Sequence, residues 1–179
     1  LKNYKISDSA TVSPIIEQSE GENISFVLVN NISFNTLNST LIPKNGNFIN
    51  FLNYIETPSS SNNGLFKNLL TYKIFNKVNK NIYSFQSKLG NIISLSDNDV
   101  LTDNKFSLGG RWLRGFDNFG VGPRNSRSSY VGGNNIIAIK LDYSREISNN
   151  SDFPFYFNLF NDSITLLSNE AVMSARSSG

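Results

Sequence analysis

Apolar and polar residues alternate along most of this chain with a period of two, which is the pattern of β-strands that have one apolar face. The clearest example is the segment of residues 65–78. Its apolar face holds Phe66, Leu70, Tyr72 and Ile74, and its polar face holds Lys67, Thr71 and Lys73. This pattern predicts a long strand with one face in an apolar environment and the other in a watery one.

Five other segments alternate in the same way and are separated by polar stretches that contain turn residues such as Pro43 and Gly46. These segments are residues 21–37, 47–58, 82–92, 135–147 and 153–162. No helical period competes with the alternation. The chain is therefore predicted to be all-β, with about six strands of ~9–14 residues.

A soluble β-sandwich and a transmembrane β-barrel both produce such alternation. The predicted strands are long for a sandwich, whose strands usually have ~5–6 residues. Short turns alternate with longer polar loops, as expected for the periplasmic and extracellular ends of a barrel. Aromatic residues near strand ends are typical of the interfacial girdles of barrels. The candidate girdle residues are Tyr54, Tyr72, Tyr83, Tyr143 and Phe153. We therefore expect an antiparallel transmembrane β-barrel, with the sandwich as the alternative.

The composition narrows the possible chemistry. The chain has 179 residues, no cysteine, no histidine and a net charge of +2. Disulfides, thiolate nucleophiles and a Ser-His-Asp triad are thereby excluded within the chain, and the low net charge argues against a nucleic-acid partner. We expect no catalytic residue, metal or cofactor, although a site built from carboxylates alone stays open. The sequence also shows neither a signal peptide nor the ~20 apolar residues of a membrane-spanning helix.

Residues 106–135 differ from the rest of the chain, because they combine seven glycines and four arginines with the only tryptophan. An aromatic residue is followed by Gly-Gly, Leu-Arg-Gly-Phe, Gly-Pro-Arg and a second Gly-Gly. The residues of this ordered set are Phe106, Gly109, Gly110, Leu113, Arg114, Gly115, Phe116, Gly122, Pro123, Arg124, Gly132, Gly133 and Asn134. The set resembles the long loop of the BamA-type outer-membrane assembly proteins.

The resemblance covers roughly residues 20–179. Pro43-Lys44-Asn45-Gly46 is similar to the family's Pro-Thr-Arg-Gly turn, and residues 159–162 are similar to its Phe-x-Asp-x-Gly strand, with Ile164 in place of the glycine. The resemblance implies that residues 1–179 are a partial C-terminal transmembrane β-barrel domain, within a barrel of about sixteen strands. Six strands cannot close a barrel, so the remaining strands and the periplasmic domains are expected outside this chain.

In the family, the long loop inserts into the barrel lumen, where acidic residues of the wall hold its arginine. This chain places Asp142 and Asp162 on the polar faces of their strands, where they could hold Arg114. A guanidinium matches two carboxylates in a fork geometry, which gives strong charge-assisted hydrogen bonds. We therefore expect Arg114 to fix the loop to Asp142 and Asp162, and Trp112 and Phe116 to anchor it by burial.

The resemblance implies a non-enzymatic insertase of the bacterial outer membrane, which folds and inserts β-barrel proteins. Its expected partners are nascent outer-membrane β-barrel proteins, the lipoproteins of the assembly complex and outer-membrane lipids. A translocation-and-assembly-module protein or a two-partner secretion pore is the alternative, because these share the Arg-Gly-Phe/Tyr loop. The Gly-Pro-Arg and the second Gly-Gly favour the insertase. An outer-membrane enzyme with a carboxylate site is a further class that the sequence supports poorly.

Overall fold

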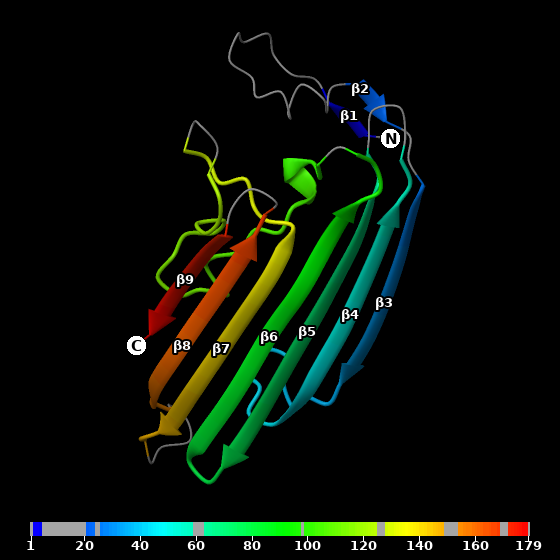
Figure 1. Ribbon diagram of the computed structural model, residues 1–179. Coiled ribbons are helices and arrows are strands. Elements are labelled where there is room, and N and C mark those ends of the chain that lie inside the picture. The colour runs from blue at the N-terminus through cyan, green and yellow to red at the C-terminus, as the bar shows by residue number, and fades with distance from the viewer. Residues whose placement is uncertain are drawn as a thin grey trace.

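The computed structural model describes residues 2–4, 21–23, 26–58, 63–97, 99–124, 128–148, 154–168 and 172–178. Its main element is one sheet of seven antiparallel strands, each of which pairs with its neighbours in the sequence. The strands are β3 Val27–Asn35, β4 Gly46–Glu56, β5 Leu65–Val78, β6 Asn81–Ser94, β7 Asn135–Glu146, β8 Tyr156–Leu167 and β9 Val172–Ser178. Figure 1 shows them side by side in this order, with β3 and β9 at the two edges.

Three small elements complete the secondary structure of the described residues. β1 Lys2–Tyr4 and β2 Gly21–Asn23 form a separate two-stranded sheet, and η1 Thr102–Asn104 is a short 3-10 helix in the loop after β6. Within the part of the chain that is described, no helix is long and apolar enough to cross a bilayer, a finding that concerns helices alone.

The six strands predicted from the alternation are all present as β3–β8. The seventh strand, β9, was not predicted, because its sequence has only two large apolar residues, Val172 and Met173, and no alternation. The predicted contrast between short turns and long loops holds only in part. The β5–β6 turn is tight, whereas the connections through residues 36–45 and 147–155 at the same end are longer.

The two faces of the sheet differ as the alternation predicted. We call the face that carries the β6–β7 loop the inner face and the opposite one the outer face. Large apolar side chains are exposed on the outer face, including Leu28, Ile32, Phe34, Ile49, Phe51, Leu70, Leu89, Ile93, Ile137, Ile139, Leu141, Phe157 and Leu159. An exposed apolar face of this size is unfavourable in water and needs a cover. In a membrane barrel, lipid covers it.

The candidate girdle residues divide between the two faces. Tyr83 and Tyr143 pair on the outer face near the β5–β6 turn, with ring centroids 5.4 Å apart. Tyr54 is on the inner face, where its hydroxyl donates to Glu56 at 3.1 Å, so its assignment to a girdle was wrong. Tyr72 is in mid-strand and contacts Phe85, and Phe153 is outside the described residues.

The core of the structure is between the inner face and the β6–β7 loop. Its buried members come from the strands and from the loop, and are Leu65, Ile92, Val100, Phe106, Leu113, Val121, Ile136, Ala138, Ile164 and Leu166. The predicted inward residues of β5 fit this arrangement: Thr71 is buried, and the Lys67 ammonium reaches the loop. The sheet therefore has an exposed apolar surface on one side and, on the other, a loop-covered face that combines buried apolar residues with polar and charged ones.

Candidate functional site

The β6–β7 loop, residues 95–134, folds back against the inner face of β5–β8 (Figure 1). Backbone hydrogen bonds of 2.9 Å in both directions join Phe106 to Gly133 and close its base. The Asn134 backbone N–H then donates to the Leu167 carbonyl at 2.8 Å, which ties this base to β8. The loop segment predicted from the motifs of residues 106–135 thus contains backbone hydrogen bonds of its own.

Two glycines show why the loop needs its unusual composition. A side chain at Gly109 would place its Cβ 2.0 Å from the Asp117 carbonyl oxygen, so only glycine allows the two backbone segments to approach. Gly122 has a φ of 133°, a conformation that other residues rarely adopt, and lies against Leu166 of β8. The Gly-Gly and Gly-Pro-Arg motifs therefore set the path of the backbone.

Apolar side chains on the underside of the loop anchor it to the wall. Leu113 is 0% exposed, and Phe106 and Val121 are also buried. Phe106 fits above Gly90 of β6, where a Cβ would come within 2.6 Å of its ring. Phe116, expected to anchor the loop by burial, is 39% exposed, so that expectation was wrong. Its neighbour Leu113 has the anchoring role instead, because the loop turns Leu113 toward the sheet.

Arg114 contacts both of the aspartates that were predicted to hold it. Asp162 Oδ2 accepts hydrogen bonds from the Arg114 backbone N–H at 3.1 Å and from Nε at 2.8 Å, and Oδ1 accepts one from Nη2 at 2.5 Å. Arg114 Nη1 is 2.6 Å from Asp142 Oδ1. The Asp162 side chain is 0% exposed and that of Arg114 is 34% exposed. The guanidinium thus forms a bidentate pair with Asp162 and a second ion pair with Asp142.

Two neighbours of this pair were not predicted as site residues. The Phe160 ring lies under the guanidinium, with its centroid 3.8 Å from Cζ, which adds a cation–π contact. Ser84 donates from Oγ to Asp142 Oδ2 at 3.1 Å. Both residues have the inward parity of their strands, which was the only signal in the sequence, because nothing there fixes how far along the wall Arg114 reaches.

Three lysines of the wall also hold the loop, and no sequence motif points to these contacts. Lys67 donates to the Asn104 carbonyl at 3.0 Å, and Lys140 donates to the Arg111 carbonyl at 2.6 Å. Lys88 lies over the Trp112 ring, 4.6 Å from its centroid. Lys140 is also the cross-strand partner of Asp162. The positive charges of Arg114 and Lys140 therefore balance the negative charges of Asp142 and Asp162.

The base of the loop has a further charged cluster around Asp99. The Asp99 carboxylate accepts from Lys105 Nζ at 2.7 Å and from Asn134 Nδ2 at 3.1 Å. Partial burial acts to raise the pKa of Asp99, but these hydrogen bonds outweigh it and lower the pKa below its ordinary value. Arg124, a residue of the predicted motif, is exposed and pairs with Tyr130 inside the loop, while Pro123 beside it is buried.

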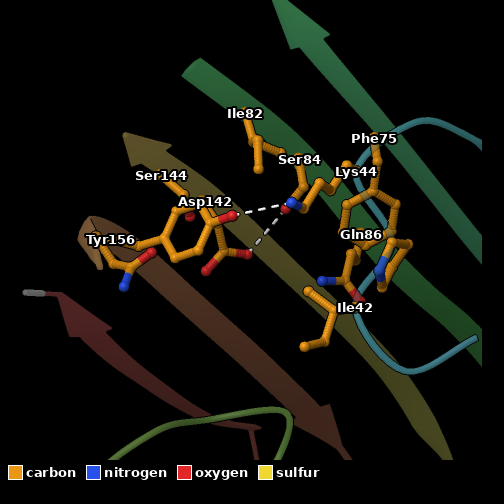
Figure 2. A pocket seen from close by; sticks show the side chains of 11 residues that line it. Ile42, Lys44, Phe75, Ile82, Ser84, Gln86, Asp142, Ser144 and Tyr156 are labelled. Atoms are coloured by element: carbon orange, nitrogen blue, oxygen red, sulfur yellow. Dashed lines mark hydrogen bonds between the residues drawn. The ribbon is translucent and has the colours of Figure 1, made fainter. Parts of the chain in front are cut away.

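A cavity of about 240 Å³ lies on the inner face at the end of the sheet opposite the long loop (Figure 2). The β3–β4 connection reaches across the sheet to form one of its walls. Lys44 of this connection donates from Nζ to the Tyr156 hydroxyl of β8 at 2.9 Å. This hydrogen bond raises the pKa of Lys44. Asp142 lines the cavity as well, so one of its oxygens contacts Arg114 while its side chain borders this space.

Comparison with known proteins places this arrangement in a family. The model of the Omp85 superfamily domain matches residues 1–178. The chain belongs to the Omp85 superfamily. It is therefore an outer-membrane β-barrel protein of a bacterium, and the exposed apolar outer face is its lipid-facing surface, while the inner face is the lumen wall.

A solved structure shows the same fold. The crystal structure of BamA from Haemophilus ducreyi lacking POTRA domains 1–3 superposes with a TM-score of 0.70 at 21% sequence identity. The match covers 81% of this Omp85 chain and 30% of the BamA chain, so this chain spans under a third of that protein. No curated protein matches the sequence. The predicted fold class, an antiparallel transmembrane β-barrel seen here as an open sheet with a long loop, is confirmed.

Proposed function

We propose that this chain is part of an outer-membrane insertase, a non-enzymatic protein that folds β-barrel proteins and inserts them into the membrane. We further propose that residues 1–179 are a partial C-terminal barrel domain, in which further strands pair with β3 and β9. An open edge exposes unpaired backbone groups, which lipid does not tolerate. Its partners in this proposal are nascent outer-membrane barrels, lipoproteins of the assembly complex and lipids.

The observation that carries the proposal is the loop with its complete set of motifs, packed against the lumen wall. The Gly-Pro-Arg and second Gly-Gly motifs favour the insertase over its sister transporters. Their residues Gly122, Pro123, Gly132 and Gly133 are buried, and Arg124 is exposed. Arg114 fixes the centre of the loop to β7 and β8. A loop held in this way makes one wall of the barrel rigid. Any opening or bending of the barrel during insertion would then occur at strands farther from this loop.

In this proposal the chain performs no covalent chemistry. An insertase acts by offering a sheet edge to which an incoming strand adds its backbone hydrogen bonds, together with a locally weakened bilayer. The ion pair of Arg114 contributes rigidity, because breaking one partner of a buried pair leaves an uncompensated charge. Leu113, Gly109, Gly110 and Gly115 serve the same end by fixing the shape of the loop.

The test uses the full-length protein reconstituted into phospholipid vesicles, with an unfolded outer-membrane barrel added as the client. An insertase is expected to raise the rate at which the client becomes heat-modifiable on a gel, compared with empty vesicles. A correctly folded protein that leaves this rate unchanged would exclude the insertase. Release of one exported partner through the vesicle membrane would instead support the alternative, a translocation-and-assembly-module or two-partner secretion transporter.

A further inference from the structure

The lipid-facing surface carries an unbroken row of asparagines. Five successive strands, β3 to β7, each place one asparagine at the same register position. The row consists of Asn30, Asn53, Asn68, Asn91 and Asn135. These residues share the outer face with Leu28, Ile32 and Leu70, which are exposed. We call this row the amide ladder.

The side-chain amides of the ladder bond to one another. Asn30 Nδ2 donates to Asn53 Oδ1 at 3.2 Å, Asn53 Nδ2 to Asn68 Oδ1 at 2.9 Å, and Asn68 Nδ2 to Asn91 Oδ1 at 3.1 Å. All three bonds run in the same direction. Within the described residues, no side-chain hydrogen bond carries the ladder on to Asn135. Each amide has two donors and two acceptor positions, so much of this capacity is left over.

The position of the ladder makes that unused capacity costly. Neighbouring strands are ~4.8 Å apart, so the five asparagines span about 19 Å across the sheet. Barrel strands tilt by ~35–45°, so a row perpendicular to them crosses about 12 Å of membrane depth. The rows on both sides are apolar, with Ile55 and Phe66 on one side and Phe51 and Leu89 on the other. Part of the ladder therefore faces hydrocarbon, where a polar group needs a partner.

A groove runs along the ladder at its β5–β7 end. Its volume is about 300 Å³, and it combines apolar walls with amides on one rim. The walls include Phe51, Leu70, Leu89 and Ile137, and the rim is formed by Asn68, Asn91 and Asn135. No charged side chain lines it. Asn135, the rim residue beyond the hydrogen-bonded part of the ladder, is half-buried at this site.

We propose that this groove binds one acyl chain of a membrane lipid, with the ester carbonyl of that chain accepting hydrogen bonds from the ladder amides. The apolar walls match a hydrocarbon chain, and the neutral amide donors match a neutral carbonyl acceptor. The absence of lysine and arginine from the lining argues against a phosphate headgroup as the bound group, because phosphates are held by such cations. The proposal rests on the outer-membrane location of the chain and is independent of the insertase function.

The experiment compares two lipids that differ only in the proposed acceptor. The full-length protein in detergent is mixed with a diacyl phosphatidylethanolamine or with the dialkyl ether of the same headgroup and chain lengths, and bound lipid is counted by native mass spectrometry. We expect the diacyl lipid to be retained about two- to tenfold better, the factor that one or two ordinary hydrogen bonds give. Equal retention of the two lipids would overturn the proposal without recourse to any variant.

Two variants locate the binding site. Replacing two of the three rim residues, Asn68→Val with Asn91→Val, should abolish the preference for the diacyl lipid. The matched control, Asn30→Val, removes an amide of the same ladder outside the groove and should keep the preference. Loss of the preference in the control alone, or its survival in the double variant, contradicts the proposal. So does a wild-type dimer that Asn68→Val with Asn91→Val dissociates, because the groove would then be occupied by a second copy.

Discussion

Both faces of the sheet hold polar groups away from bulk water, but these groups find partners in different ways on the two faces. On the inner face the loop covers a cluster of full charges, in which Arg114 pairs with Asp142 and Asp162. On the outer face the polar groups of the amide ladder are neutral and bond to one another. The full charges of the inner cluster are compensated by other protein groups, whereas the polar row of the outer face is built from neutral amides.

Removing the cation of the inner cluster should have the largest effect. Arg114→Ala leaves two carboxylates facing each other, one of them fully buried, and we expect a loss of about 3–5 kcal/mol, toward the lower end because the arginine is one-third exposed. Protease cleavage near Asn118–Gly120 of the full-length protein should become faster, and the protein should unfold at a lower denaturant concentration. Arg111→Ala, in the same loop, is the control and should change little. Equal behaviour of the two variants would rule out the fixing role of Arg114.

Moving a charge to the outer face should come next in size. Asn68→Lys puts an ammonium among lipid chains without a partner, and we expect a loss of about 2–4 kcal/mol if this position is near the bilayer midplane, less if it is near an interface. Asn161 of β8 is exposed on the same outer face in another register row, so Asn161→Lys tests a second position of that face. Unfolding in denaturant from lipid vesicles measures both. An unchanged stability for Asn68→Lys would mean that the outer face is not in lipid at this position.

The two aspartates should differ from each other by a smaller amount. Asp162→Asn should destabilise more than Asp142→Asn, because Asp162 is fully buried and accepts three hydrogen bonds from Arg114, whereas Asp142 makes one ion pair with it. We expect a difference of about 1.5–3 kcal/mol, the net worth of one hydrogen bond to a charged group. Loop protection in hydrogen exchange measures it. The reverse order would assign the main role to Asp142.

The smallest effect concerns the base of the loop and depends on pH. The folded-state pKa of Asp99 is below its ordinary value, so its ion pair with Lys105 stabilises the loop above the unfolded pKa, near 4, and this contribution is lost as pH falls through the folded value. Asp99→Asn should therefore raise hydrogen exchange at Phe106 and Gly133 at about pH 6, and the difference should shrink as the pH falls below the ordinary carboxyl pKa, near 4. A difference that persists unchanged at the lower pH would exclude the carboxylate as its cause.

The strands were predictable because lipid and lumen impose opposite chemistry on successive residues, and the six segments that alternate are all strands. β9 lacked that signal, since its pairing with β8 depends on backbone hydrogen bonds. The pairing of Arg114 with Asp142 and Asp162 followed from a motif and from strand parity, and the structure brings the three together. Their role in fixing the loop stays a prediction.

Contacts between segments far apart in the sequence were not predictable. Lys44 and Tyr156 are 112 positions apart, and neither has a motif that points to the other. The contacts of Lys88 and Lys140 depend on the path of the loop backbone, which the glycines set through close approaches that a sequence does not display. The asparagines of the ladder are visible in the sequence, but only the register aligns them in one row.

In the seven-stranded sheet each strand pairs with its neighbours in the chain, which has a consequence for the order of assembly. Contacts that close short connections form early, so the sheet can grow one hairpin at a time except at the β6–β7 pair, whose connection is residues 95–134. Arg114, however, needs Asp162, 48 positions later. We therefore expect the loop to stay open until the β7–β8 hairpin exists, which makes its closure a late step and a marker that this part of the barrel wall is complete.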